Sequence, residues 1–192
     1  MNWVAFALFS WVLLGLETSM RGTLALGDAY RASPSFVFPF AAFLAIAAPS
    51  TTARWSALLL GLLVDLMTSL ETRDAGASIT LLGPNALGYL LAAQLIIIIR
   101  ALLFPRNPLS LGFVSFAGYL VAQIVVVALY TLRHRFDPSM VWEATPELVS
   151  RLLAALYTGG VAVLLGMLFI PFAGVLGLQI GSPRGRFARR GI

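Results

Sequence analysis

The side chain with the greatest chemical interest is Asp65, a carboxylate in an otherwise apolar run. The run Ala57–Leu66 contains no other charged residue. A carboxylate in an apolar medium is costly and is expected to face a bundle interior or water. Gly61 lies four residues earlier, on the same face of a helix, where it lets a neighbouring helix come close. We interpret Asp65 as a buried polar anchor or part of a ligand or proton path. A wetted position near the end of its helix, or a cap on the following turn, is the alternative.

A second informative stretch follows 18 residues after Asp65 and begins with Gly83-Pro84-Asn85. A proline inside an apolar run breaks or kinks a helix, whereas Gly83 and Gly88 permit close packing. The Asn85 amide needs a hydrogen-bonding partner in apolar surroundings. Two interpretations stay open: a hinge that faces Asp65, and a plain helix start preceded by a loop or re-entrant segment over 75–82.

We expect Asp65 to pair with polar groups near Asn85 or Gln123 and so to fix the arrangement of two helices. The candidate binding or structural residues are Gly61, Asp65, Gly83, Pro84, Asn85, Gly88 and Tyr89.

The remaining polar residues in apolar runs are predicted to have modest roles. Glu17 lies near the end of its run, where solvation at the rim explains it. Arg100 and Arg151 stand at the ends of apolar runs, where arginine usually extends toward water. Gln94 and Gln123 are isolated amides that we interpret as contacts between helices rather than as ligand contacts.

Templates for catalysis are absent from this sequence. Its one histidine, His134, is predicted to lie in a loop, and there is no cysteine. Ser-His-Asp chemistry, a histidine-rich metal site and thiolate catalysis therefore lack their side chains. There is no H-E-x-x-H, no glycine loop with lysine and no pair of carboxylates within the apolar runs. We predict a protein that is not an enzyme and that needs no metal or cofactor.

The elements that must position these residues are long apolar helices. Of 192 residues, 59% are hydrophobic and 11% are charged, whereas a soluble domain has about 25% charged residues. The apolar residues form blocks rather than the alternation of a surface helix, as in helices that face lipid. We predict an all-α, polytopic membrane helix bundle that forms a single transmembrane domain over 1–192.

Six apolar blocks come near the roughly 20 residues that a membrane crossing requires. The second is short for a full crossing, and Pro171 is expected to end or kink the sixth, leaving 172–178 at the interface. The Thr145-Pro146-Glu147 sequence marks the start of the sixth helix. The predicted helices cover Trp3–Met20, Ser35–Ala48, Trp55–Leu70, Ser78–Leu103, Leu109–Leu132 and Glu147 to beyond Pro171.

The basic residues are all arginines and give a net charge of +5. They are spread between the apolar blocks, apart from a cluster at the C-terminus (Arg184, Arg186, Arg189, Arg190). In a membrane protein this pattern indicates orientation and attraction to anionic headgroups rather than binding to nucleic acid. With six crossings both termini share one side, and the arginine-rich tail predicts that this side is cytoplasmic.

Small residues recur at four-residue spacing in the sixth helix. Ala155 and Gly159 form one pair, and Ala162 and Gly166 form the next. Small-x-x-x-small seams allow two helices to approach closely, so these four residues are predicted to be helix-packing positions. A partner interface there is a weaker hypothesis, because such seams are common within bundles.

The runs Gly61–Leu66 and Gly83–Leu90 together resemble the MreD family of rod-shape-determining membrane proteins. The family has a glycine- and leucine-rich helix that ends in an aspartate, then a glycine-containing turn and a helix with an aromatic residue. The resemblance covers mainly Trp55–Leu103, and a spacer over Met67–Leu82 is longer here than in the family. It implies a non-enzymatic scaffold or regulator of peptidoglycan elongation in the bacterial inner membrane. Expected partners are an MreC-like bitopic protein, an MreB-like filament and the RodA glycosyltransferase with its penicillin-binding transpeptidase.

A substrate-binding (S) component of an ECF-type vitamin transporter is the alternative. Such components share the six-helix form, and their fold is similar to that of MreD. They carry an Ala-x-x-x-Ala surface on the first helix for docking to the coupling subunit. In this chain the first helix offers Ala5 and Ala7, which have the wrong spacing, so the scaffold hypothesis ranks first.

Overall fold

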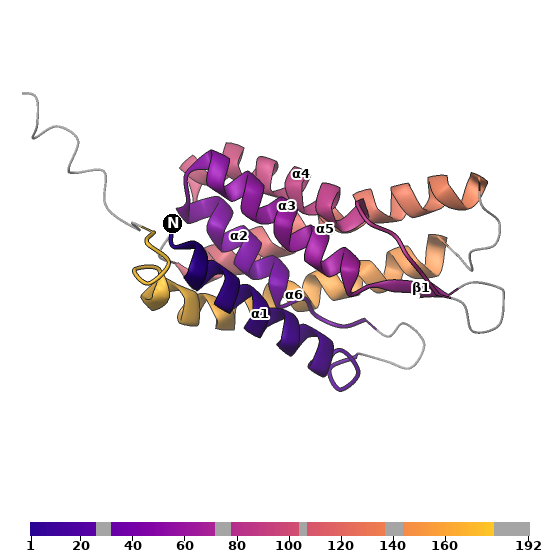
Figure 1. Cartoon of the computed structure of the whole chain (residues 1–192), viewed down its shortest axis with the longest axis horizontal. Coiled ribbons are helices and arrows are strands. Elements are labelled where there is room, and N and C mark those ends of the chain that lie inside the picture. The colour runs from indigo at the N-terminus through magenta and orange to yellow at the C-terminus, as the bar shows by residue number, and fades with distance from the viewer. Residues whose placement is uncertain (26–31, 72–77, 104–106, 137–143, 179–192) are drawn as a thin grey trace, which may run out of the picture.

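The computed structural model describes residues 1–25, 32–71, 78–103, 107–136 and 144–178, and these form a bundle of antiparallel helices (Figure 1). A 3-10 turn, η1 (Arg100–Leu102), follows α4, and two three-residue strands lie between α3 and α4. The helices are α1 (Trp3–Met20), α2 (Val37–Ala47), α3 (Ser50–Leu66), α4 (Pro84–Ile99), α5 (Pro108–Phe136) and α6 (Ala144–Phe172).

The centre of the bundle is α2, which the other five helices contact. Every residue from Val37 to Ala45 is buried, as expected for a helix that is apolar on all sides. Its 11 residues make a helix about 16 Å long, too short for a hydrocarbon core of about 30 Å. Because protein surrounds α2, its length need not match the bilayer. This enclosure explains the short second block in the sequence.

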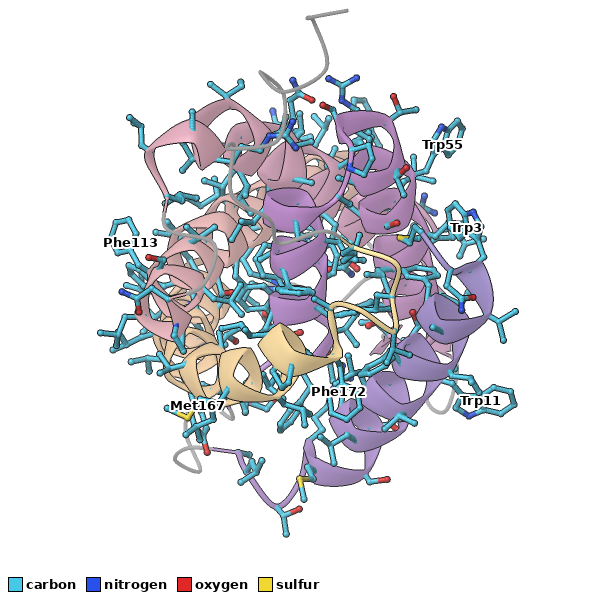
Figure 2. The ribbon with its side chains drawn as sticks, turned by 90° about the vertical axis from the view of Figure 1, so that its left-hand side faces the viewer. Trp3, Trp11, Trp55, Phe113, Met167 and Phe172 are labelled. Carbon is cyan, nitrogen blue, oxygen red and sulfur yellow. The ribbon has the colours of Figure 1, made fainter. Side chains whose placement is uncertain are left out.

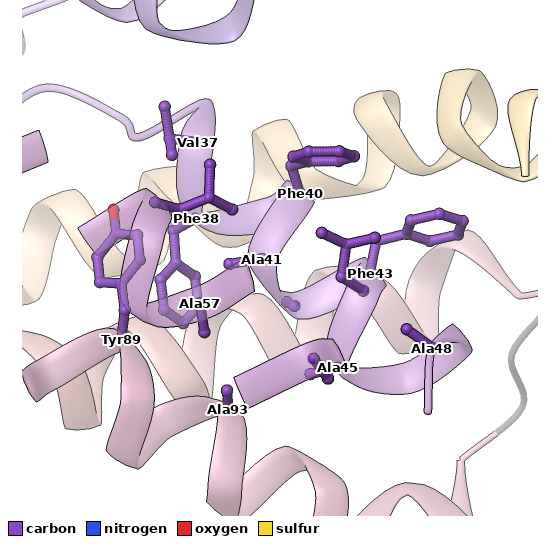
Figure 3. Packing of buried hydrophobic residues seen from close by; sticks show 14 of the residues in the cluster. Val37, Phe38, Phe40, Ala41, Phe43, Ala45, Ala48, Ala57, Tyr89 and Ala93 are labelled. Carbon is purple, nitrogen blue, oxygen red and sulfur yellow. The ribbon is translucent and has the colours of Figure 1, made fainter. Parts of the chain in front are cut away.

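The aromatic side chains of α2 point in several directions into the core, and Tyr89 of α4 lies beside Phe38 (Figure 3). Phe38 meets the Tyr89 ring edge to face with centroids 5.0 Å apart. Phe40 and Phe43 both contact Phe169 of α6, at 5.5 and 5.6 Å. Edge-on and offset ring pairs add to the stabilisation that burial provides, so α2 is held by side chains of both α4 and α6.

Large apolar side chains also cover the outside of the bundle (Figure 2). Trp11 is 79% exposed, and Phe113 and Met167 are exposed by more than 60%. Among the described residues, four helical segments are long and apolar enough to cross a membrane: Trp3–Met20, Pro84–Leu102, Pro108–Phe136 and Thr145–Phe172. The chain is therefore a helical bundle of the kind that membrane proteins form. Six crossings remain a prediction, since α2 and α3 are shorter.

Among the residues that the structure describes, a short β-hairpin interrupts the succession of helices. Strands β1 (Ser69–Glu71) and β2 (Ser78–Thr80) pair antiparallel, so the all-α prediction omitted this element. The two edges of such a hairpin leave backbone groups unpaired, which hydrocarbon does not tolerate. The hairpin lies at the end of the bundle where α3 ends and α4 begins, and it indicates that this end meets water or headgroups. We call it the Glu17 end, after the residue near the end of α1, and call the opposite end the Met1 end.

Several predicted helix boundaries were displaced. The third helix begins and ends earlier, at Ser50 and Leu66, and the fourth begins at Pro84 rather than at residue 78. The fifth continues to Phe136, so His134 lies in the last helical turn and not in a loop. The sixth begins at Ala144 and ends at Phe172, one residue after Pro171, as expected where a proline ends a helix.

The small-residue seam of α6 is filled by α5. A Cβ on Gly159 would lie 2.8 Å from Cβ of Phe116, and one on Gly166 would lie 3.2 Å from Leu111. Ala155 and Ala162 are fully buried. All four positions are therefore packing positions within this chain. They leave no exposed surface for the partner interface that was the weaker hypothesis.

Candidate functional site: two buried carboxylates and a polar cavity

Asp65 accepts hydrogen bonds from the first turn of α4. Its Oδ2 receives the backbone N–H groups of Gly83 at 2.8 Å and Ala86 at 3.1 Å. Its Oδ1 receives the backbone N–H and the side-chain amide of Asn85, both at 3.0 Å. The first N–H groups of a helix have no partner within it, so the completely buried carboxylate of Asp65 caps α4 from a neighbouring helix. The expected pairing with Asn85 is present; Gln123 instead contacts Arg151.

Gly83 and Pro84 shape the turn that presents these donors. Gly83 has φ of +120°, a backbone conformation that residues with a Cβ atom rarely adopt. Pro84 is the first residue of α4, where its missing N–H costs no hydrogen bond. Pro84 therefore starts a helix, and of the two open interpretations the structure shows the helix start rather than a kink.

Close helix contacts bring Asp65 onto α4. A Cβ on Gly61 would lie 2.6 Å from Cα of Ala86, and one on Gly88 would lie 2.7 Å from the carbonyl oxygen of Ala122. The glycines therefore let α3, α4 and α5 approach backbone to backbone. Tyr89 belongs to the apolar core beside Phe38 and does not join the polar group around Asp65.

Glu17 caps the next helix as Asp65 does, and we call each of these acid-to-helix contacts a joint. The prediction that water at the rim solvates Glu17 was wrong. The residue is 8% exposed. Its Oε2 accepts from the Ser35 hydroxyl and from the backbone N–H groups of Phe36 and Val37, each at 3.0 Å. The Ser35 N–H donates to Thr158 Oγ1 at 2.9 Å, which ties this joint to α6.

The two joints follow one design. In each, a carboxylate near the end of one helix binds the N-terminal N–H groups of the next helix. Negative charge at a helix N-terminus is favoured by the orphan donors and by the helix dipole. The pairs α1–α2 and α3–α4 are thereby locked by charge-assisted hydrogen bonds, which are the stronger kind.

Between the joints lies a polar cavity of about 260 Å³. Asn85 belongs both to the Asp65 joint and to the cavity wall. Residues from α1, α3, α4, α5 and α6 contribute to the lining, together with 32–34 and Thr68. The charged and amide residues among them are Glu17, Arg21, Asn85, Gln123, Glu147 and Arg151.

Arg151 crosses the cavity wall from α6 to α5, although the sequence predicted that it extends toward water. Its Nη1 donates to Oε1 of Gln123, and its Nε lies 3.2 Å from Oε2 of Glu147. The guanidinium carbon lies 5.8 Å from the centre of the Tyr130 ring, within range of a cation–π contact. Gln123 thus links two helices, as expected for it.

A similar pair stands at the Met1 end. Arg54 donates from Nε to Oε1 of Gln94 at 2.8 Å, which joins α3 to α4. Arg100 donates to the carbonyl oxygen of Ala48 and to the Ser50 hydroxyl. Gln94 and Gln123 therefore both act between helices, and of the described residues at the Met1 end, Arg54 and Arg100 each bind protein groups.

The chemistry that this arrangement supports is binding. The cavity offers amide and guanidinium donors together with carboxylate acceptors, held on several helices. Within the described ranges, no group of three or more histidine, cysteine, aspartate or glutamate side chains is placed to hold a metal ion.

Fold and site together define a helical membrane bundle whose interior contains two capped helix joints and a polar cavity. Comparison with family models, with curated proteins and with solved structures found no match to this chain.

Proposed function

We propose that this protein is a non-enzymatic scaffold or regulator of the cell-elongation (peptidoglycan) complex in the bacterial inner membrane. The observation that supports the proposal is the joint between Asp65 and the start of α4. The MreD-like motif consists of Gly61–Leu66 and Gly83–Leu90, two runs that a long spacer separates in the sequence. In the fold, β1 and β2 lie within this spacer, and Asp65 hydrogen-bonds to Gly83, Asn85 and Ala86.

The proposed arrangement in the membrane has six crossings and both termini in the cytoplasm. The Met1 end then faces the cytoplasm, and the Glu17 end with its hairpin and cavity faces outward. Proposed partners are an MreC-like bitopic protein, an MreB-like filament and RodA with its penicillin-binding transpeptidase. The broad exposed apolar faces of α1, α5 and α6 offer surfaces for lipid and for the membrane helices of such partners.

Co-purification tests this proposal. The tagged chain is extracted in mild detergent from its own cells, and we expect a single-span protein with a coiled-coil region to co-purify. Asp65→Leu should lose both this partner and support of rod shape, because it removes the cap of α4. Gly22→Ala is the control, since Gly22 lies beyond the end of α1 and a Cβ there meets nothing within 4 Å. Normal cell shape after complete depletion of the protein would contradict the proposal.

The cavity favours a second candidate, an S component of an ECF-type transporter, because such a protein must enclose a small molecule. Recovery of energy-coupling transporter subunits alone in the same purification would replace the first proposal by this one. The Ala5 and Ala7 spacing counts against it.

A further inference from the structure

The cavity at the Glu17 end is larger than helix capping requires. Its volume of about 260 Å³ equals that of roughly nine water molecules at ~30 Å³ each. Pockets for drug-sized ligands begin near about 300 Å³, so this space is large enough only for a smaller molecule. Its lining comes from five helices, and such convergence of distant segments on one polar space is typical of a binding site.

The charged residues of the lining are balanced. Two arginines, Arg21 and Arg151, and two glutamates, Glu17 and Glu147, line one space, and Arg151 pairs with Glu147 on α6. A ligand that carries a single charge would meet two side chains of its own sign, which is unfavourable at close range. A ligand with both signs can place each group against its opposite.

Several polar groups of the cavity wall are held by protein contacts before any ligand enters. Glu17, Asn85 and Gln123 are each less than 9% exposed and hydrogen-bonded to protein. Arg151 is held by Gln123 and Glu147. Prearranged polar groups reduce the ordering cost of binding.

We propose that this cavity binds a small zwitterion, a molecule with one ammonium group and one oxyanion. The guanidinium groups of Arg151 and Arg21 take the oxyanion, and the carboxylate of Glu147 takes the ammonium group. This chemistry occurs in free amino acids and in the phosphoethanolamine headgroup of a lipid. The inference goes beyond the scaffold function, and under the transporter candidate the cavity would be the substrate site.

Access to the cavity can be measured with single cysteines, because the chain has none. Ser33→Cys places a thiol in the cavity lining, and Ser56→Cys places one at a fully buried position of α3. A charged maleimide should label the first and not the second. Glycine or glycerophosphoethanolamine, a phosphodiester with one negative charge like the lipid headgroup, should slow labelling of Ser33→Cys. Acetate and ethylamine, which carry one charge each, should not.

Binding to the purified chain is measured by calorimetry in detergent with glycine and with glycerophosphoethanolamine. Retention of phosphatidylethanolamine over phosphatidylglycerol in nanodiscs is measured by native mass spectrometry. Arg151→Gln should weaken binding about tenfold or more, the usual effect of losing a charged hydrogen bond. Arg54→Gln is the matched control, because Arg54 makes the same arginine–glutamine contact between helices but is not among the cavity-lining residues.

Glu147→Gln is the second variant, because the Glu147 side chain is half-exposed and its replacement should leave the fold and the elution profile unchanged. It should weaken the binding of both zwitterions. Binding of the soluble probes assigns a free solute, and selective retention of phosphatidylethanolamine alone assigns a headgroup. Binding of neither probe nor lipid, equal binding of acetate, or an equal loss in Arg54→Gln would overturn the proposal. Each readout uses the purified chain, so its failure is distinct from a failure to recover the proposed partners.

Discussion

Two buried acids in this bundle act as helix caps. A carboxylate inside a membrane protein normally indicates an ion path or a paired cation. Here Asp65 and Glu17 have backbone N–H groups as partners, so each acid compensates donors that lipid would leave unsatisfied. The desolvation of the carboxylate and the orphan donors of the next helix are offset by the same hydrogen bonds.

Replacement of Asp65 should be strongly destabilising, and the size should depend on the substitute. Asp65→Leu leaves three backbone N–H groups without an acceptor, and we expect a loss of about 3 kcal/mol or more in unfolding free energy. Asp65→Asn keeps one acceptor oxygen and should lose about half as much. Denaturant titration of the purified protein in mixed micelles measures both. An Asp65→Leu protein that folds, inserts and supports cell shape normally would contradict the role of this cap.

The joint at Asp65 could be predicted from the sequence, whereas the joint at Glu17 could not. Asp65 stands deep in an apolar run, and Asn85 is a polar residue at the start of the next one, so their pairing follows from the need to satisfy both. Glu17 lies near the end of its helix, where a solvated acid and a buried one have the same local sequence. The difference is made by Ser35, Phe36 and Val37, which the fold brings back onto Glu17.

Glycines allow neighbouring helices of this bundle to pack closely. Gly61 and Gly88 join α3, α4 and α5, while Gly112 and Gly159 join α5 to α6. The four-residue spacing in α6 predicted a close contact, but it could not name the partner, because every helix here is apolar enough to qualify. The three-residue strands escaped prediction because such short segments carry no periodic signal.

Adjacent glycines in α6 provide a matched test of helix contact. Gly159→Ala places a Cβ 2.8 Å from Cβ of Phe116, and we expect a loss of about 1–3 kcal/mol from overpacking. Gly160→Ala meets nothing within 4 Å and should be neutral or stabilising by up to about 1 kcal/mol, through helix propensity. Thermal unfolding of the two variants in one detergent compares them. Equal stability would show that α5 and α6 are not in close contact there.

At the scale of the whole molecule, the bundle has an apolar exterior around an enclosed central helix. The helical membrane character was predictable from composition and block length, because lipid demands both. The central position of α2 was not predictable, because nothing in its own sequence indicates that five helices surround it. The cavity was also hidden, because its lining comes from distant segments, each of which contributes only a few residues.

Orientation can be tested with two exposed positions at opposite ends of the bundle. Gly22→Cys lies just beyond α1, at the Glu17 end, and Thr51→Cys lies in the first turn of α3, at the Met1 end. In intact spheroplasts an impermeant maleimide should label Gly22→Cys, and Thr51→Cys should require permeabilisation. The reverse pattern would invert the proposed topology. Release of the protein from membranes by carbonate would contradict membrane integration itself.

The two capped joints have a consequence for biogenesis. Glu17 is synthesised before α2, and Asp65 is synthesised before α4. Each acid therefore enters the membrane before the helix that it caps. A nascent chain that stops after α1 or α3 would hold an unsatisfied carboxylate in lipid, and one more helix removes the defect. Helices 1 and 2, and then 3 and 4, should therefore leave the translocon as pairs.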